Sequence, residues 1–251
     1  MDNKYRRILD IPYIELHFIL EMQEDCVLSA NKASALRGGM GQMLLRSSCV
    51  QDRECEKCIF SEECLVQRIM YSPFDIKPPF VTKGESIGFH LECENYQREF
   101  SAGDSLEFQL TLFGKTIVYF YQILQAFYML GQEGLGEGRA RYLVSGVTNT
   151  NREVIVDGTM IYMFDCFAGI EADQMDLTGR IPAMAGQKSW PSKVRRHSTT
   201  HDRDIVLRGI KGYLDFEEIE PDLRRLLYAG EILHIGKNTR FGFGRYTMVE
   251  A

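Results

Sequence analysis

Four of the seven cysteines lie in one short window, with the spacing Cys49-x5-Cys55-x2-Cys58-x5-Cys64. The central C-x2-C pair suits two thiolates on one tetrahedral ion, and four soft ligands of this kind favour zinc. Four protein ligands would complete the coordination shell, so the predicted zinc site is structural. The alternatives are an iron–sulfur cluster on the same cysteines and unligated thiols in a loop. We expect the remaining cysteines in the hydrophobic core: Cys26, Cys93 and Cys166.

Histidine is the side chain best suited to proton transfer, because its ordinary pKa lies near neutral pH. His197 and His201 lie in the most cationic stretch of the chain, where a phosphate would be attracted, although that stretch could also be a solvated loop. His17 lies on the polar side of an alternating segment, where it is either a surface residue or a catalytic one. The catalytic candidates are therefore, in order, His201, His197 and His17. We predict that the two histidines in apolar runs are packed within strands: His90 and His234.

Two glycine-rich stretches could let backbone amides approach a phosphate, because glycine carries no Cβ. One is the loop 131–141, and the other follows the apolar run 232–235, which is predicted as a buried strand. A strand–turn–strand hairpin that needs glycine only for its turn is an equally good interpretation of the second stretch. The predicted phosphate contacts in the two stretches are Gly136, Gly138, Arg139, Lys237, Arg240, Gly242, Gly244 and Arg245.

The composition is that of an ordinary soluble globular protein of 251 residues, with 45% hydrophobic and 25% charged residues. The formal net charge of −6 argues against attraction of nucleic acid to the whole surface, but a local basic groove remains compatible with it. No apolar run approaches the roughly 20 residues that cross a bilayer, and the first residues do not read as a signal peptide. We therefore expect a cytoplasmic protein.

The apolar periodicity predicts a strand at 13–22, a helix at 33–44, strands at 86–93 and 105–113, a buried helix at 117–130, and a strand ending near 147. This is the split βαβ order of a ferredoxin-like domain. The second half reads as short strands near 153–166, a polar and weakly patterned stretch at 171–200, a strand pair at 203–216, and a helix from Pro221 that ends before Gly230.

Several stretches, in this order, resemble the RAMP superfamily and most closely its CRISPR-associated endoribonuclease, which cuts precursor CRISPR RNA within its repeats. They are Ala35-Leu36-Arg37-Gly38-Gly39-Met40-Gly41, the cysteine window, the Pro-Pro-Phe at 78–80, the Gly-Leu-Gly-Glu-Gly-Arg loop at 134–139 and the segment 195–246. The resemblance implies an α+β fold with two ferredoxin-like (RAMP/RRM-like) domains in tandem. The first would be 1–149, with a cysteine-rich metal-binding insert at 49–83, and the second 150–251, with a glycine-rich hairpin.

The activity that the resemblance implies is metal-independent, sequence-specific endoribonuclease cleavage of CRISPR repeat RNA, with no cofactor for catalysis. A ribose 2′-OH attacks its own 3′-phosphate, which requires a proton acceptor, a proton donor and cations around the developing charge. Gln42 holds the position where relatives commonly place a helix histidine, and glutamine cannot transfer a proton at neutral pH. Beyond the glycine-rich stretches, the RNA-binding residues expected are Arg37, Lys193, Arg195 and Arg196.

Three functions stay open at this point. The first is cleavage of the precursor transcript to give guide RNAs, and the second is a non-cleaving RNA-binding RAMP subunit of a CRISPR effector complex. The third is an interaction module stabilised by zinc or an iron–sulfur cluster, without a role on RNA. The expected partners are repeat RNA and other CRISPR effector proteins, with no membrane, and pairing into a homodimer stays open.

Overall fold

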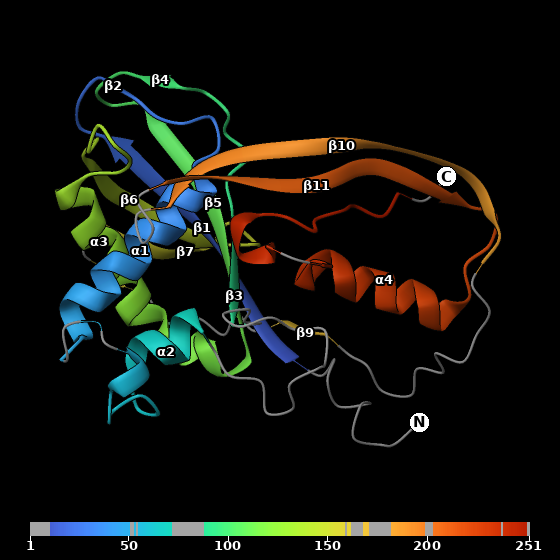
Figure 1. The fold of residues 1–251 in the computed structure, drawn as a ribbon, viewed down its shortest axis with the longest axis horizontal. Coiled ribbons are helices and arrows are strands. Elements are labelled where there is room, and N and C mark those ends of the chain that lie inside the picture. Colours follow the sequence, from blue (N-terminus) through green and yellow to red (C-terminus); the bar gives the residue numbers. More distant parts are fainter. Residues whose placement is uncertain are drawn as a thin grey trace. The chain divides into compact units, whose positions relative to one another are not determined.

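The computed structural model describes most of the chain, namely residues 11–50, 53, 55–71, 88–158, 160–161, 168–170, 182–198, 203–236 and 238–249. The chain divides into two compact units (Figure 1). The sheet unit comprises Pro12–Ala168 together with Arg240–Gly242. The hairpin unit comprises Met1–Ile11, Gly169–Thr239 and Phe243–Ala251.

The sheet unit follows the expected ferredoxin-like order. Its elements are β1 (Ile11–Met22), α1 (Ala33–Ser48), β3 (Phe89–Glu92), β5 (Ser105–Phe113), α3 (Phe120–Glu133) and β6 (Tyr142–Asn149). The four strands lie in the antiparallel order β3-β5-β1-β6. This order follows from two βαβ crossovers with each helix returning over the same face.

The sheet unit continues beyond the boundary expected at residue 149. β7 (Val154–Asp157) pairs with β6, and β8 (Met160–Ile161) pairs with β7, so the sheet is extended at its β6 edge. The transition to the hairpin unit falls within β9 (Ala168–Ile170).

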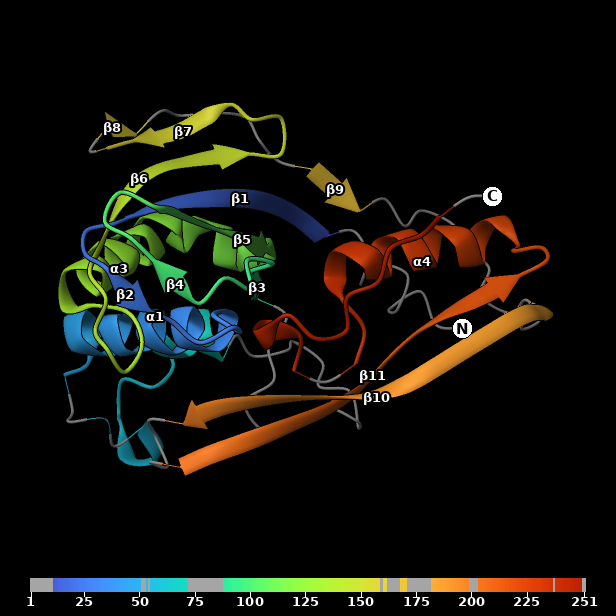
Figure 2. The same cartoon turned by 90° about the horizontal axis from the view of Figure 1, so that it is seen from above.

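One face of this sheet and the two helices that cover it form the core. Figure 2 shows α1 and α3 on the same side of β1, β5 and β6. Leu16, Phe18 and Leu20 alternate along β1 and are fully buried on that face. The Phe18 ring lies 4.8 Å from Phe108 on β5 and 5.0 Å from Phe127 on α3, so it joins both layers.

Glycines allow α1 to pack closely on its neighbours. A Cβ at Gly39 would lie 2.5 Å from a side-chain carbon of Leu130 on α3, and a Cβ at Gly41 would lie 2.9 Å from Met70 on α2 (Leu65–Met70). Close packing therefore explains the glycine at both positions. Gly38 has no such neighbour within 4 Å.

Short elements complete the sheet unit. β2 (Cys26–Val27) pairs with β4 (Glu99–Phe100). The 3₁₀ helices among the described residues are η2 (Cys55–Lys57), η3 (Gly114–Tyr119) and η4 (Thr239–Phe241). The boundary between the two units falls within η4. In the part of the chain that the structure describes, no helix is long and apolar enough to cross a membrane.

The hairpin unit is built on two long strands rather than on the short strand pair predicted at 203–216. β10 (Met184–Ser198) and β11 (Arg203–Phe216) are antiparallel, with a register that runs from Met184↔Phe216 to Ser198↔Arg203. The sequence of β10 lacks a clear hydrophobic alternation because most of its described side chains are exposed. Without a buried face, period-two patterning gives no signal.

The predicted strand at 232–235 is also wrong, because α4 (Pro221–Leu233) continues past Gly230. Gly230 lies within the helix, where its missing side chain leaves room for Tyr246 and Ile235. The Tyr246 hydroxyl donates a hydrogen bond to the carbonyl of Leu227. Among the described residues after α4 there is no strand, so the glycine-rich segment is a loop and not a hairpin.

Candidate functional site

One face of the β10–β11 hairpin is exposed and cationic. Lys193 on β10 lies directly opposite Arg208 on β11, and Arg195 follows two positions further on the same face. All three side chains are exposed. In the described ranges none of them forms a salt bridge. Like charges directly across a strand pair repel one another, and a bound anion would offset that repulsion.

Arg208 is absent from the predicted binding residues, although the sequence already shows a cluster of cations around it. The sequence cannot give the strand register that places Arg208 opposite Lys193. β10 also contains Arg196 and His197, whose positions pair with Ile205 and Asp204. Two further predicted residues lie outside the described residues: His201 and Lys237.

The loop at 134–139 contains glycines of two kinds. Gly134 and Gly136 have φ angles of 93° and 74°, a region that disfavours other residues, so the turn itself requires them. Gly138 has an ordinary backbone, and a Cβ there would meet nothing within 4 Å. No internal contact explains the glycine at this position, and Gly138 and Arg139 are both exposed. This part of the loop can therefore receive a ligand close to the backbone.

The glycines of the C-terminal loop have an internal explanation. Gly242 and Gly244 have φ angles of 75° and 77°. The amide of Ile235 donates to the carbonyl of Gly244 at 3.0 Å and closes the loop. A Cβ at Gly244 would lie 3.0 Å from the backbone nitrogen of Ile235. The turn alone accounts for these two glycines, although no described strands flank it as the hairpin interpretation predicted.

Two of the predicted RNA-binding arginines have structural contacts within the sheet unit. Arg240 Nη1 donates to the carbonyl of Met70 at the end of α2, at 2.5 Å. The Arg37 guanidinium on α1 lies 4.7 Å from the centre of the buried Phe241 ring. These contacts attach the segment 240–242 to α1 and α2. Arg245 is exposed.

His17 lies on the half-buried polar face of β1, opposite Gln109 on β5 and Thr148 on β6. Glu15, on the same face, accepts hydrogen bonds from Gln109 Nε2 at 3.0 Å and from Thr150 Oγ1 at 2.9 Å. The helices cover the other face of the sheet, so the structure does not bring His17 together with Gln42 of α1.

This polar face also includes Tyr13, whose pKa is shifted. Burial and the nearby Glu15 raise the pKa of Tyr13 above its usual range. Tyr13 therefore stays protonated at neutral pH and can donate a hydrogen bond, whereas Glu15 accepts two.

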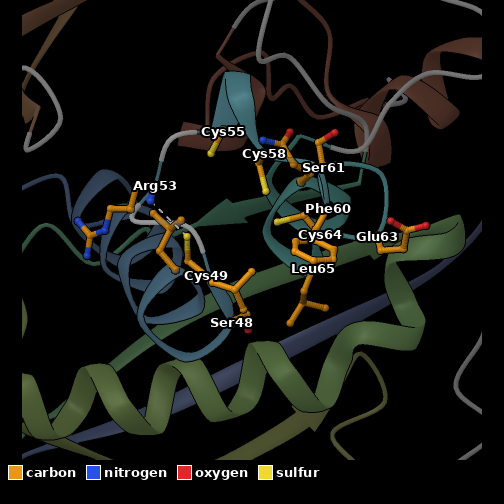
Figure 3. Close-up of a pocket in the computed structure, with 13 residues that line it drawn as sticks. Ser48, Cys49, Arg53, Cys55, Cys58, Phe60, Ser61, Glu63, Cys64 and Leu65 are labelled. Atoms are coloured by element: carbon orange, nitrogen blue, oxygen red, sulfur yellow. Dashed lines mark hydrogen bonds between the residues drawn. The ribbon is translucent and has the colours of Figure 1, made fainter.

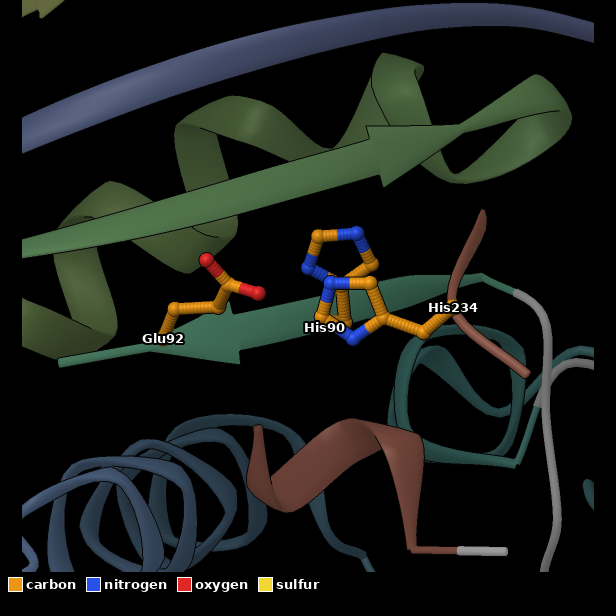
Figure 4. Close-up of side chains that lie close together, drawn as sticks. All are labelled: His90, Glu92 and His234. Carbon is orange, nitrogen blue, oxygen red and sulfur yellow. The ribbon is translucent and has the colours of Figure 1, made fainter. Parts of the chain in front are cut away.

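His90 and Glu92 extend from β3, and His234 lies just beyond the end of α4 (Figure 4). His90 is buried in a strand as predicted, with its ring 5.3 Å from that of Phe113. His234 is buried as well, but it is not in a strand. It is the C-cap residue of α4 and has a φ of 60°, which ends the helix.

The four window cysteines line one cavity of the sheet unit (Figure 3). Cys49 is the C-cap of α1, Cys64 is the N-cap of α2, and Cys55 lies in η2 between them. None of these cysteines is in a disulfide. Of the cysteines expected in the core, Cys26 and Cys93 pack against it, and Cys166 lies outside the described residues.

Two family models match this chain, each over more than half of its length. One is described as CRISPR-associated endoribonuclease Cas6 and matches residues 106–246. The other is described as an N-terminal domain and matches residues 11–164. The chain belongs to the CRISPR-associated endoribonuclease Cas6 family, which confirms the resemblance inferred from its motifs. No curated protein matches the chain.

The solved structures that match the chain include proteins that carry the name of the same family or of the superfamily. A partial Cas6-RT-Cas1–Cas2 complex is 10% identical, with a TM-score of 0.49, and the match covers 96% of this chain and 46% of that chain. A CRISPR-associated protein Cas6 is 10% identical, with a TM-score of 0.39 and coverage of 95% and 100%. A RAMP protein binding different RNA substrates is 12% identical, with a TM-score of 0.45 and coverage of 94% and 100%. The chain spans less than half of the first of these proteins.

The helices and antiparallel sheets of the structure confirm the expected α+β class. In the sheet unit the strand order itself defines the ferredoxin-like fold. In the hairpin unit, β10 and β11 form a separate two-stranded sheet that is followed by α4, whereas β9 pairs with β1.

Proposed function

We propose that this protein binds CRISPR repeat RNA in the precursor transcript and cleaves it without a catalytic metal, giving guide RNAs. The observation that carries this proposal is the exposed cationic face of β10–β11, in a chain of the Cas6 family with an overall net charge of −6. In a net-negative protein, a local cluster of cations is the part of the surface that attracts a phosphate backbone.

Lys193, Arg195 and Arg208 would contact RNA phosphates. Lys193 and Arg195 are two residues apart on β10, which separates their Cα atoms by about 6.8 Å along the strand. Arg208 lies across from Lys193, at about 5 Å between Cα atoms. The three charges therefore cover a compact area that would stabilise more than one phosphate. Gly138 and Arg139 would offer a second contact to the backbone of the RNA.

The proposed reaction is attack of a ribose 2′-OH on the adjacent 3′-phosphate. The 2′-oxygen forms a bond to phosphorus, the bond from phosphorus to the 5′-oxygen breaks, and the products are a cyclic phosphate and a 5′-hydroxyl. A base takes the proton of the 2′-OH, and an acid protonates the leaving oxygen. The cations of the hairpin face would stabilise the charge that develops on the phosphate.

The histidines near the hairpin end are the first candidates for this proton transfer. β10 ends at Ser198 and β11 begins at Arg203, so His201 belongs to the connection between these strands and His197 to the end of β10. Both lie in sequence close to the proposed phosphate contacts. His17 remains the third candidate, on the polar face of β1 beside Glu15.

The test is incubation of the full chain with end-labelled repeat RNA in EDTA, followed by analysis of the product ends. We expect cleavage that gives a cyclic phosphate and a 5′-hydroxyl. His201→Ala should bind the RNA as the parent does and cut it about 10²–10⁴-fold more slowly. Equal cutting by His201→Ala, His197→Ala and His17→Ala would exclude these histidines as the acid or base.

One observation favours a second function, a non-cleaving RNA-binding subunit of a CRISPR effector complex. Gln42 occupies the helix position where the resemblance leads us to expect a histidine, and an amide cannot act as a general acid or base at neutral pH. If the parent protein binds repeat RNA tightly but never cuts it, this second function replaces the first. If it binds neither repeat RNA nor unrelated RNA, both fail.

A further inference from the structure

The cysteine window is the one chemical motif that the proposed function does not use. Its four thiols lie on a segment that connects the end of α1 to the start of α2. Cys49 caps one helix and Cys64 the other. Cys55 begins η2 and Cys58 follows it, and the Cys58 amide donates to the Cys55 carbonyl at 3.4 Å. Sequence spacing and fold therefore bring all four to one cavity of about 450 Å³ (Figure 3).

The hydrogen bond of one window cysteine, Cys49, differs from that of Cys93, a cysteine that packs against the core. Cys49 Sγ accepts a hydrogen bond from the amide of Arg53 at 3.4 Å. Arg53 has a φ of 69°, which is unfavourable for a residue with a side chain, so this turn is held in a specific conformation. Cys93 Sγ instead donates to the carbonyl of Glu107 at 3.4 Å, which only a protonated thiol can do. The Cys49 sulfur is therefore the acceptor in its hydrogen bond, whereas the Cys93 sulfur is the donor.

Little else in the segment accounts for its folded conformation. Its large apolar side chains do not enter the core: Val50, Ile59 and Phe60 are 73%, 78% and 51% exposed. Among the described contacts, the chain between the two helix caps is attached mainly by short turns and by a bond from Arg68 Nε to the carbonyl of Glu62 at 3.0 Å. A segment of this kind lacks the apolar burial that normally offsets the entropy of ordering a chain.

We propose that Cys49, Cys55, Cys58 and Cys64 ligate one metal centre that links the end of α1 to the start of α2. Four thiolates select a soft metal, which means zinc or iron in a sulfide cluster. Such a centre supplies the folding energy that the exposed segment lacks. The centre has no part in the proposed RNA cleavage, so either proposal can fail without the other.

The spacing of the sulfurs bears on the identity of the metal. Four thiolates on one zinc ion, at about 2.3 Å each, lie about 3.8 Å from one another in tetrahedral geometry. Among the described residues, no three of these sulfurs lie within 4.8 Å of one another. A single zinc ion therefore requires the segment to contract around it. A cluster of several iron and sulfide atoms is wider and requires less contraction.

The test is metal analysis of the full chain, purified without air and without chelators. Zinc, iron and acid-labile sulfide are measured per chain, together with the visible absorption spectrum. About one zinc per chain supports the centre as a single-ion site, and iron with sulfide and visible absorption supports it as a cluster. Less than one tenth of a metal per chain, both as purified and after reconstitution with zinc or with iron and sulfide, overturns the proposal.

Variants assign the ligands. Cys55→Ser and Cys58→Ser should each lower the bound metal at least tenfold, whereas the control Cys26→Ser, which changes a half-buried cysteine on β2, should keep it. Limited proteolysis gives a second readout on the parent protein, which does not depend on the folding of any variant. Removal of the metal should increase the rate of cleavage within 50–64 at least several-fold while the rest of the sheet unit remains protected. Unchanged metal content in both ligand variants would overturn the assignment.

Discussion

At the scale of single residues, the sharpest prediction concerns the cations of the hairpin face. Lys193→Ala and Arg208→Ala should each weaken the binding of repeat RNA, since each removes a charge from the exposed pair. Each should also make the affinity less dependent on salt, by about 0.7 in the slope of log K against log salt for every phosphate of a single strand that is no longer neutralised. The measurement is a titration of RNA binding over a series of salt concentrations.

The control for the salt experiment is Arg225→Ala, which removes an exposed cation from α4 of the same unit. Its salt slope should equal that of the parent. Equal slopes in all three variants would remove the hairpin face from the path of the RNA.

A buried tyrosine gives a prediction on the dependence of stability on pH. Burial raises the pKa of Tyr142 far above its usual range, and its hydroxyl donates to the carbonyl of Phe127 at 3.0 Å. Below about pH 10 the Tyr142 hydroxyl is protonated in both the folded and the unfolded protein, so its contribution to the free energy of unfolding is fully present. Above that pH the unfolded tyrosine loses its proton and the folded one keeps it, so the free energy of unfolding falls by about 1.4 kcal/mol per pH unit.

Tyr142→Phe tests this linkage. At pH 7 the free energy of unfolding of the variant should be about 0.5–1.5 kcal/mol lower than that of the parent, because one buried hydrogen bond is removed. Above about pH 10 the difference should shrink and then change sign, because phenylalanine has no proton to lose. Denaturant unfolding at a series of pH values measures both effects, with Tyr121→Phe, at a position 63% exposed, as the matched control. A constant difference between Tyr142→Phe and the parent across the series would contradict the linkage.

At the scale of elements, two adjacent glycines of α1 should respond in opposite directions to the same change. Gly38→Ala should raise the free energy of unfolding by about 0.5–1 kcal/mol, because alanine favours the helix and meets nothing within 4 Å. Gly39→Ala should lower it by about 1–3 kcal/mol, because its Cβ would lie 2.5 Å from Leu130 in the packed interface with α3. Urea unfolding of both variants measures the difference. Equal effects of the two changes would mean that the α1–α3 contact is not close at Gly39.

The elements also show where sequence patterns are informative. The pattern predicts β1 correctly because Leu16, Phe18 and Leu20 face a core and the residues between them do not. It misses β10 because a strand with both faces largely exposed has no such alternation. The run 232–235 resembles a strand because a short, mostly apolar run carries no period, and its first two residues instead form the last turn of α4.

The sequence predicts the parts of the candidate site that depend on residue type. It does not predict the parts that depend on how two strands are aligned. The cysteine spacing alone predicts that the four thiols share one location, and they line one cavity. Arg208 cannot be selected among the neighbouring cations until β11 is aligned with β10. Charge alone predicts that Arg37 and Arg240 contact RNA, and their contacts with Phe241 and Met70 cannot be read from the sequence.

At the scale of the whole molecule, the two units are not successive segments of the chain. The polypeptide passes from one unit to the other after Ile11, after Ala168, after Thr239 and after Gly242. Only three residues, Arg240–Gly242, return to the sheet unit near the C-terminus, and they bring the Arg240–Met70 and Phe241–Arg37 contacts with them.

This interleaving links the two units by four covalent connections. No single cut of the chain yields both units intact, since a fragment that ends at Ala168 lacks the three residues that complete the sheet unit. The tethers also keep the 240–242 segment at a high effective concentration near its docking position on α1 and α2, as in an intramolecular ligand. The same three residues supplied as a free peptide would bind more weakly. A free peptide loses translational entropy on binding, whereas the tethered segment has already lost it.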